Sequence, residues 1–190
     1  MIWLAPVTEA LSLAQQHRAV WQLLHHALAE HGITLRPERI EYSPTGKPSL
    51  ADQSVHFSLS HDPTMVAAIT GTCPVGIDVE AIRPFRQVAL AMAFSPQEQA
   101  RIQDSPQPEL SFFARWCLKE SELKRKGGVL DKSIRRLSYP EAFSWERQAL
   151  TPIERVSAEQ WLIITKRHVI AVSGIHYDNA QQRKIRFHRL

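Results

Sequence analysis

Two pairs of charged residues, one in a strand pattern and one in a helix pattern, constrain the fold of this chain most. Asp78 and Glu80 are two positions apart in an apolar run and therefore face the same side of an extended strand. Glu120 and Lys124 are four positions apart in a long helical pattern and therefore share one helix face. Three carboxylates and an ammonium can converge only if that strand packs against that distant helix.

Such a group would be a candidate site for a hard cation and a phosphorylated substrate. Mg²⁺ takes oxygen ligands and keeps part of its shell for water and substrate phosphates, which suits a small carboxylate set beside a lysine. Taken alone, Glu120 and Lys124 are more often a surface ion pair. Asp78 and Glu80 alone would fit a sheet with one polar face. Only the combination favours a functional site.

Composition sets limits without selecting a function. The chain has 190 residues, 44% hydrophobic and 22% charged, which suits one globular domain or two small halves that share an interface. No apolar run is long enough to cross a bilayer, and the first residues lack the features of a secretory signal. Cys73 and Cys117 lack a metal-ligand spacing, so we expect two buried, reduced thiols. These observations favour a cytoplasmic protein.

The net charge of +4 favours an acidic partner but does not select one. A phosphate ligand, a nucleic acid and an acidic protein remain open on charge alone. The consecutive residues Ser60, His61 and Asp62 cannot line up as nucleophile, base and orienting group, which excludes a serine hydrolase triad. Asp62 precedes Pro63 and is therefore expected in a turn.

Hydrophobic periodicity predicts helices and strands in an alternating order, which indicates the α+β class. The predicted helices cover 10–31, 96–103 and 109–126, the second capped by Ser95 and the third ended by Gly127 and Gly128. The predicted strands cover 54–60, 65–70, 75–80, 135–139, 142–147, 161–166 and 169–176, before a basic tail at 179–190. The order favours two similar α+β halves. Phe113, Trp116 and Cys117 are expected in the core.

Five short motifs occur in an order that points to a known family. They are Gly46-Lys47-Pro48, Phe57-Ser58-Leu59-Ser60-His61, Gly76-Ile77-Asp78-Val79-Glu80, Phe94-Ser95-Pro96-Gln97-Glu98 and the run from Trp116 to Lys124. The set, within about residues 42–130, resembles the 4'-phosphopantetheinyl transferases. It is most similar to their Sfp-type branch, in which one chain is built of two similar halves.

The resemblance implies a pseudo-dimeric α+β fold with an active site between the halves. Residues 1–74 would form the half that holds the nucleotide end of coenzyme A, and residues 75–178 the half with the metal and catalytic residues. The implied reaction transfers phosphopantetheine from coenzyme A to a serine of an apo acyl or peptidyl carrier protein and releases adenosine 3',5'-bisphosphate. We expect a monomer that binds neither nucleic acid nor membrane.

The resemblance also implies roles for individual residues. Asp78, Glu80 and Glu120 would hold Mg²⁺. The chemistry leaves open whether Glu120 also takes the serine proton as the catalytic base, directly or through a water. Lys124 would act in catalysis and, with Lys119, offset phosphate charge. The residues expected to contact the nucleotide end are Arg18, Lys47, Ser60 and His61.

Two further expectations concern the carrier and the coenzyme. The segment 83–101, with Phe85, Arg86 and Met92, is a hypothetical docking surface for an acidic carrier helix. Many relatives have a second serine after the Ser-His pair, where this chain has Asp62. An acid there would weaken coenzyme binding unless it points away from the phosphates.

Two other classes of function stay open on the sequence. A basic nucleic-acid-binding module would explain the net charge and the tail, but it leaves the acidic residues unexplained. A different Mg²⁺-dependent phosphotransferase or phosphodiesterase would use the same acids on another substrate. The sequence does not show which carrier protein or pathway is served.

Overall fold

Residues 1–137, 154–175 and 185–188 are described by the computed structural model. Within them the strands form two four-stranded sheets and a short hairpin. The first sheet has the order β10 (Ile185–Phe187), β1 (Ile2–Pro6), β5 (Met65–Gly71) and β4 (His56–Asp62). The second has the order β6 (Gly76–Ala81), β9 (His168–Ser173), β8 (Gln160–Ile164) and β7 (Glu154–Arg155). The hairpin pairs β2 (Ile40–Tyr42) with β3 (Pro48–Leu50).

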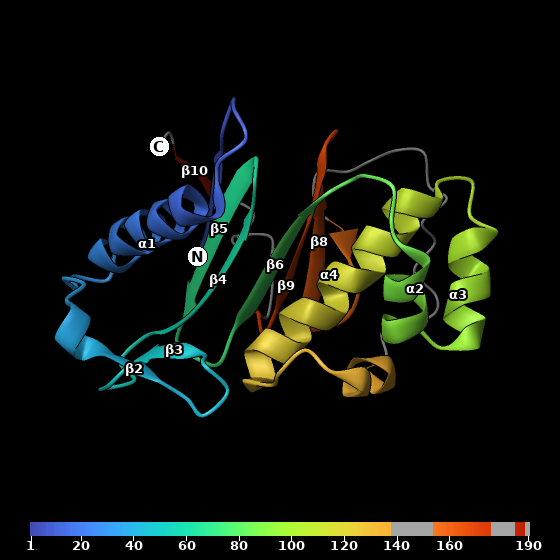
Figure 1. Ribbon diagram of the computed structural model, residues 1–190. Coiled ribbons are helices and arrows are strands. Elements are labelled where there is room, and N and C mark those ends of the chain that lie inside the picture. Colours follow the sequence, from blue (N-terminus) through green and yellow to red (C-terminus); the bar gives the residue numbers. More distant parts are fainter. Residues whose placement is uncertain (138–153, 176–184, 189–190) are drawn as a thin grey trace.

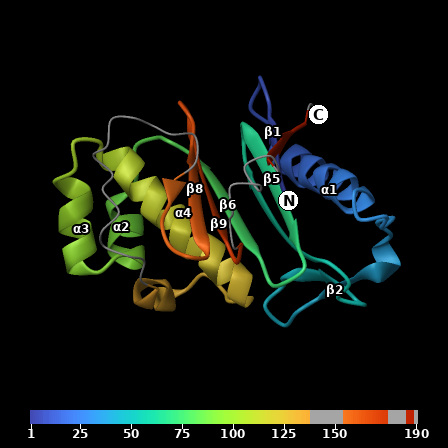
Figure 2. The ribbon, with the colours of Figure 1, turned by 180° about the vertical axis from the view of Figure 1, so that it is seen from behind.

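Helices cover the outer faces of the two sheets (Figures 1 and 2). The first sheet carries α1 (Leu13–Ala29), and the second carries α4 (Pro108–Lys126). On the side away from α1, α4 is flanked by α2 (Gln87–Ala93) and α3 (Pro96–Gln103). Short 3-10 helices occupy Pro37–Arg39 and Lys132–Arg136. The mixed architecture confirms the predicted α+β class.

The first helix forms for reasons that are visible in its sequence. Ser12 and Gln15 make a reciprocal capping box at its start, which satisfies two amide groups that the helix itself leaves free. Its buried stripe includes Val20, Leu23 and Ala27, which pack on the first sheet. The predicted helix over 10–31 is thus confirmed, although it begins three residues later and ends two residues earlier.

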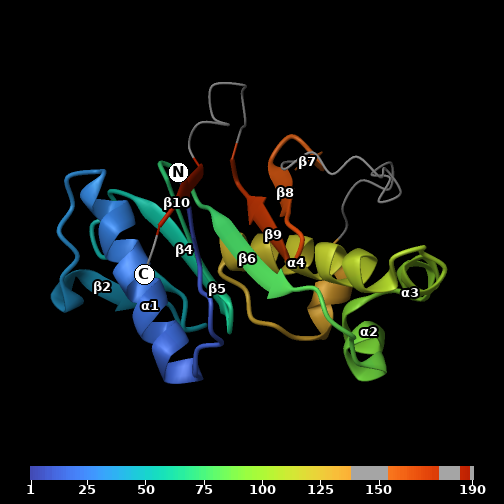
Figure 3. The same cartoon turned by 90° about the horizontal axis from the view of Figure 1, so that it is seen from above.

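Apolar side chains of both sheets form one buried cluster between them. It joins Leu4 and Ile69 of the first sheet to Ile77, Val79 and Ile170 of the second. A separate cluster lies between the second sheet and the helices α2 to α4. Figure 3 shows β4 and β5 beside β6, with α1 on one side and α4 on the other. The strand and the helix that carry the acidic residues therefore pack against each other.

Close packing brings α4 onto β6. A Cβ atom on Gly76 would lie 1.8 Å from the backbone oxygen of Ser121, so only glycine permits this approach. The helix ends where Gly127 adopts a left-handed conformation at φ 69°, as the predicted stop at this residue requires. The predicted helix over 109–126 is confirmed, with one residue more at its start.

Several other elements match the sequence prediction, and some do not. The strands β4, β5, β6, β8 and β9 and the Ser95-capped helix α3 are confirmed. A strand over 135–139 is wrong in its described part, because residues 132–136 form a 3-10 turn that buries Ile134. The predicted strand 142–147 lies outside the described residues. Part of the predicted tail forms β10, which pairs with β1 in parallel.

The composition predicts no membrane span and two buried thiols. Among the described residues, no helix combines the length and apolar character that a membrane span requires. Both cysteines are free, and Cys117 is buried, but Cys73 is exposed. The expectation of a buried thiol at Cys73 is therefore wrong, because this residue lies in the connection between β5 and β6.

Candidate functional site at the junction of two sheets

The acidic residues of β6 and α4 gather where β6 passes under the helix. Asp78 and Glu120 are almost fully buried, at 5% and 8% exposure. Glu80 is half-buried at the end of the same strand. Residues 112, 116, 120 and 124 recur every four positions and therefore share one face of α4. The helix and the strand together supply the three carboxylates.

Lys124 connects the helix to both sheets. Its Nζ lies 2.7 Å from Asp78 Oδ1 and 3.1 Å from the hydroxyl of Ser60 on β4. Burial lowers the pKa of the Lys124 ammonium, but the charges of Asp78 and Glu120 and the hydrogen bond to Asp78 outweigh it. The pKa of Lys124 therefore lies above its usual value, and the side chain is charged.

The remaining acids repel one another. Burial, the charge of Asp78 and the charge of Glu80 raise the pKa of Glu120 to about 7, although Lys124 opposes this shift. Burial and Asp78 also raise the pKa of Glu80, while Arg83, 2.7 Å away, lowers it. The three carboxylates thus carry more negative charge than Lys124 and Arg83 offset. A proton or another cation would therefore stabilise the cluster.

One oxygen of this cluster supports a cation site. Asp78 Oδ2 is buried and accepts no hydrogen bond from the described residues, and leaving such an atom unpaired is costly. Carboxylate oxygens are the ligands that Mg²⁺ takes in proteins. Across 1–137, 154–175 and 185–188, however, no three His, Cys, Asp or Glu side chains converge closely enough to hold a metal ion. The donors fit a hard cation, but their side chains would have to move together to bind it.

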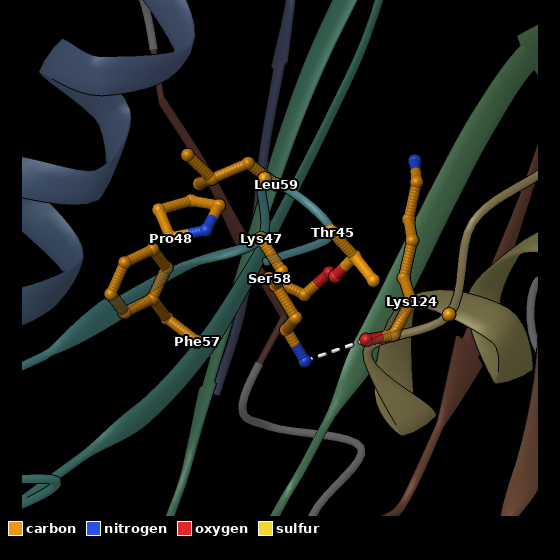
Figure 4. A pocket seen from close by; sticks show the side chains of 9 residues that line it. Thr45, Lys47, Pro48, Phe57, Ser58, Leu59 and Lys124 are labelled. Atoms are coloured by element: carbon orange, nitrogen blue, oxygen red, sulfur yellow. Dashed lines mark hydrogen bonds between the residues drawn. The ribbon is translucent and has the colours of Figure 1, made fainter. Parts of the chain in front are cut away.

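A pocket of about 220 Å³ opens on the Lys124 side of the cluster (Figure 4). It lies between the chain around β3, the strand β4 and the end of α4. Lys47 enters it and donates to the backbone oxygen of Lys124 at 2.6 Å, while Thr45 donates to the oxygen of Gly127. Burial, followed by the nearby charge of Arg125, lowers the pKa of Lys47. The segment 45–47 therefore caps the C-terminal end of α4.

The other residues expected at the nucleotide end are spread around this region. Ser60 follows the pocket-lining Leu59 on β4 but does not itself line the pocket, and it bonds to Asp78 and Lys124. His61 faces the opposite side of β4 and bonds Gln16 through Nδ1 at 2.9 Å. Burial and the charge of Lys124 lower the pKa of His61. Arg18 is exposed on α1 and does not line the pocket.

Lys119 points away from the acids. Its side chain is buried, and Nζ donates to the backbone oxygen of Ala93 at 3.1 Å and pairs with Glu98 at 3.0 Å. Nζ also lies 5.0 Å from the centre of the Phe94 ring. A phosphate contact of the kind that the resemblance implied would require breaking these interactions. In this structure Lys119 fixes α4 against the start of α3.

Sequence reasoning missed a second pocket, of about 280 Å³, on the Glu80 side of the cluster. Its lining includes Glu80, Arg83, Phe85, Phe112 and Trp116. The rings of Phe85 and Phe112 stack at 4.4 Å. Trp116 was expected in the core but is only partly buried here, whereas Phe113 and Cys117 are buried as predicted. The four-residue spacing of Phe112, Trp116 and Glu120 is the sequence signal that could have found this pocket.

The fold and the site define an α+β protein with a buried cluster of carboxylates and a lysine at the junction of two sheets. Residues 74–173 match the family model of the 4'-phosphopantetheinyl transferase superfamily, and the chain belongs to this superfamily. The matched range contains the acids of β6 and α4 and both lysines of the Trp116–Lys124 motif, but not the residues expected at the nucleotide end.

Curated relatives agree with this assignment. The chain is 31% identical over 109 residues to the 4'-phosphopantetheinyl transferase psf-1 of Bacillus pumilus, which covers 55% of this chain and 47% of that protein. It is 30% identical over 131 residues to a putative 4'-phosphopantetheinyl transferase of Haemophilus influenzae, covering 66% and 54%. It is 31% identical over 85 residues to Sfp of Bacillus subtilis, covering 43% and 38%. These matches support the Sfp-type branch. The chain thus spans about half the length of the curated relatives it matches.

Proposed function

We propose that this protein transfers the 4'-phosphopantetheine group from coenzyme A to a serine of an apo acyl or peptidyl carrier protein. Adenosine 3',5'-bisphosphate would be released. The observation that carries the proposal is the set of buried Asp78 and Glu120 and half-buried Glu80 beside Lys124, because these groups suit pyrophosphate chemistry. Family membership and the names of the relatives support the same activity.

The three carboxylates would hold Mg²⁺. The unpaired buried oxygen of Asp78 and the raised pKa values of Glu80 and Glu120 are the features that support this role. When bound, the ion supplies positive charge to the pyrophosphate oxygens. Lys124 would add a fixed ammonium beside the same oxygens, because Asp78 and Ser60 hold its Nζ at this position.

The reaction requires one proton transfer and one displacement. The carrier serine oxygen would bond to the phosphorus nearest the pantetheine, while the bond from that phosphorus to the bridging oxygen breaks. Glu120 would take the serine proton, since its carboxylate lies among the acids beside the reacting phosphates in this arrangement. The electron pair leaves on the bisphosphate product, where Lys124 offsets the charge.

The two pockets divide coenzyme A between them in this proposal. The pocket beside Lys47 would take the nucleotide end, with Ser60 next to it on β4. His61 and Arg18 do not line this pocket and would contact the nucleotide only where it extends beyond the pocket. The aromatic pocket beside Glu80 would take the apolar pantetheine arm. Along α4 the order is then aromatic ring, carboxylate and ammonium, which matches the order of arm, reacting phosphorus and nucleotide.

The carrier would approach from the aromatic side. The rim of that pocket includes Arg83 and Arg86, whose charges suit an acidic carrier surface, with Met92 packed nearby. In this proposal the protein is a cytoplasmic monomer. Residues 1–74 form one half of it and residues 75–178 the other.

The test is intact-mass measurement of purified apo carrier proteins of both classes after incubation with the protein, coenzyme A and Mg²⁺. The expected result is a gain of one phosphopantetheine group, lost with Glu120→Gln and retained with Glu122→Gln. Glu122 is the matched control because it lies on the same helix but pairs with Arg125 and Lys126 instead. Folded wild-type protein that modifies no carrier would contradict the proposal and favour another Mg²⁺-dependent phosphotransferase.

A further inference from the structure

The strands β4 and β6 lie side by side without a backbone ladder between them. Each is the outer strand of its own sheet among the described residues, β4 of the first and β6 of the second. Figure 3 shows the two strands next to each other at the junction of the sheets. An outer strand leaves a row of backbone amide groups without partners unless something else binds them. Here the row on β6 is satisfied by side chains.

Three side chains of β4 accept hydrogen bonds from alternate amides of β6. Ser58 Oγ accepts from the amide of Ile77 at 3.2 Å, and Ser60 Oγ accepts from that of Val79 at 3.1 Å. Asp62 Oδ2 accepts from the amide of Ala81 at 3.3 Å. Donor and acceptor are 19 residues apart in each case, so the two strands run in parallel with a constant register. We call these three contacts the side-chain ladder.

Short side chains make the ladder possible. Ser58, Ser60 and Asp62 occupy alternate positions of β4 and so point to the same face, and each is only 5 or 6% exposed. A serine hydroxyl reaches a neighbouring amide only when the backbones approach closely. The ladder therefore fixes both the separation and the register of two strands that belong to different sheets.

The middle contact of the ladder also reaches the acidic cluster. The Ser60 hydroxyl donates to Asp78 Oδ1 at 2.9 Å, and it accepts from Val79 and from Lys124 Nζ at 3.1 Å. A hydroxyl has one proton to donate and two lone pairs, so every position on Ser60 is used. Ser58 differs from Ser60 because its hydroxyl contacts only the backbone of β6 in the described structure.

The third contact reaches Glu80 through an arginine. Asp62 Oδ1 accepts from the amide and the hydroxyl of Thr64, which directs the carboxylate towards β6. Arg83 lies 3.5 Å from Asp62 Oδ2 and 2.7 Å from Glu80 Oε2. The Asp62 carboxylate is thus bound by β6 and by its own turn, and it does not line the Lys47 pocket.

We propose that the side-chain ladder is a positioning device in which the Ser60 hydroxyl sets the orientation of Asp78 and Lys124. Asp62 acts in the same way on Glu80 through Arg83. The Ser58 hydroxyl, at the edge of the Lys47 pocket, bonds β6 without contacting the side chains of Asp78 or Lys124. The proposal rests on the proposed function, because it assigns the ladder to the site that would hold the cation and coenzyme A. Ser60 then orients two side chains of the site, in addition to making the nucleotide contact that the family resemblance implies.

Amide hydrogen exchange followed by NMR tests the ladder itself without metal or substrate. Ser58→Ala should lower protection chiefly at Ile77, and Ser60→Ala chiefly at Val79, because each hydroxyl binds one amide. Ser60→Thr keeps a hydroxyl and should restore protection at Val79. Unchanged protection at these amides in both alanine variants would overturn the ladder.

Mn²⁺ binding to the protein without coenzyme A tests the positioning role. We expect Ser60→Ala to weaken Mn²⁺ binding about tenfold, as loss of an outer partner of a metal ligand typically does. Ser58→Ala should leave Mn²⁺ affinity unchanged, although both variants lose one contact between the sheets, and Ser60→Thr should restore it. Equal Mn²⁺ affinities for the two alanine variants, or no Mn²⁺ binding by wild type, would overturn the positioning role.

These outcomes are distinct from those of the carrier experiment. If the protein modifies no carrier but Ser60→Ala still differs from Ser58→Ala in Mn²⁺ affinity, the proposed function fails and the positioning role stands. If carriers are modified but the two variants bind Mn²⁺ equally, the activity stands and the positioning role fails.

Discussion

Lys124 Nζ lies 2.7 Å from Asp78 Oδ1, and this contact ties α4 to β6 at the centre of the acidic cluster. The ammonium is the nearest cation to a carboxylate whose second oxygen has no hydrogen bond among the described residues. The Lys124 ammonium therefore offsets part of the negative charge that a bound cation would otherwise offset. This relationship makes Lys124 the first residue to test.

Replacing Lys124 by methionine should lower the rate of carrier modification about a hundredfold, because a fixed charge beside the reacting phosphates is lost. Lys126→Met is the control, since Lys126 pairs with Glu122 and its side chain is 56% exposed. Initial rates of mass gain on an apo carrier protein measure the effect. Equal rates for both variants would contradict the role of Lys124.

Replacing Glu120 by glutamine should stabilise the metal-free protein at high pH. The pKa of Glu120 rises from 4.5 to about 7 on folding, so its contribution to stability is present below pH 4.5 and is lost as pH rises through 7. Glu120→Gln removes this loss, and its free energy of unfolding relative to wild type should rise by on the order of 3 kcal/mol between pH 4.5 and 8. Urea unfolding with a chelator at both pH values checks this. A pH-independent difference would show that Glu120 does not titrate in this way.

Replacing Gly76 by alanine should destabilise the protein by about 3 kcal/mol, because the new methyl group meets the backbone of α4. The nearest atom, Ser121 O, would be 1.8 Å away and belongs to a helix that cannot shift freely. Gly71→Ala is the matched control, since its nearest neighbour is the side chain of Val75 at 2.9 Å. Its cost should be about 1 kcal/mol. Unfolding free energies of the two variants should therefore differ clearly, and similar values would mean that α4 does not pack on β6 this closely.

Replacing Lys119 by methionine separates two possible roles of this residue. If Lys119 fixes α4 to α3, the variant should lose about 3 kcal/mol of stability and keep its KM for coenzyme A, because Glu98 is left without this partner. Glu98→Gln should give a similar pattern and serves if Lys119→Met folds poorly. A raised KM with unchanged stability would instead support the phosphate contact implied by the family.

Local sequence patterns predicted the elements whose stabilising features are local. The helix α3 has a capping box and a proline at its start, and β4 alternates apolar and polar residues. The sequence prediction did not include the strand β1 or the helix α2, because each lacks the local pattern that marks its kind of element. The apolar run Ile2–Pro6 does not alternate, and Gln87–Ala93 begins without a side-chain cap. Both elements depend on packing against distant residues, which no local pattern reveals.

In the candidate site, too, local spacing was predictable and contacts between distant segments were not. The spacing of Asp78, Glu80, Glu120 and Lys124 predicted that these residues share a strand face and a helix face, and the structure gathers them at one junction. Their hydrogen-bond partners were not predictable, because the contact between Ser60 and Asp78 depends on how two sheets meet. Motif position alone likewise could not show that Lys119, next to Glu120, points away from it.

The pairing of β10 with β1 affects the order in which the molecule is completed during synthesis. On the ribosome, β1 can pair with β5 early, but its other edge stays open until residues 185–187 emerge. The amide of His188 then bonds the oxygen of Leu4, which adds a further link between these distant segments. An exposed strand edge invites pairing with another chain in the meantime. Nascent chains halted before residue 185 are therefore the species in which self-association would be greatest.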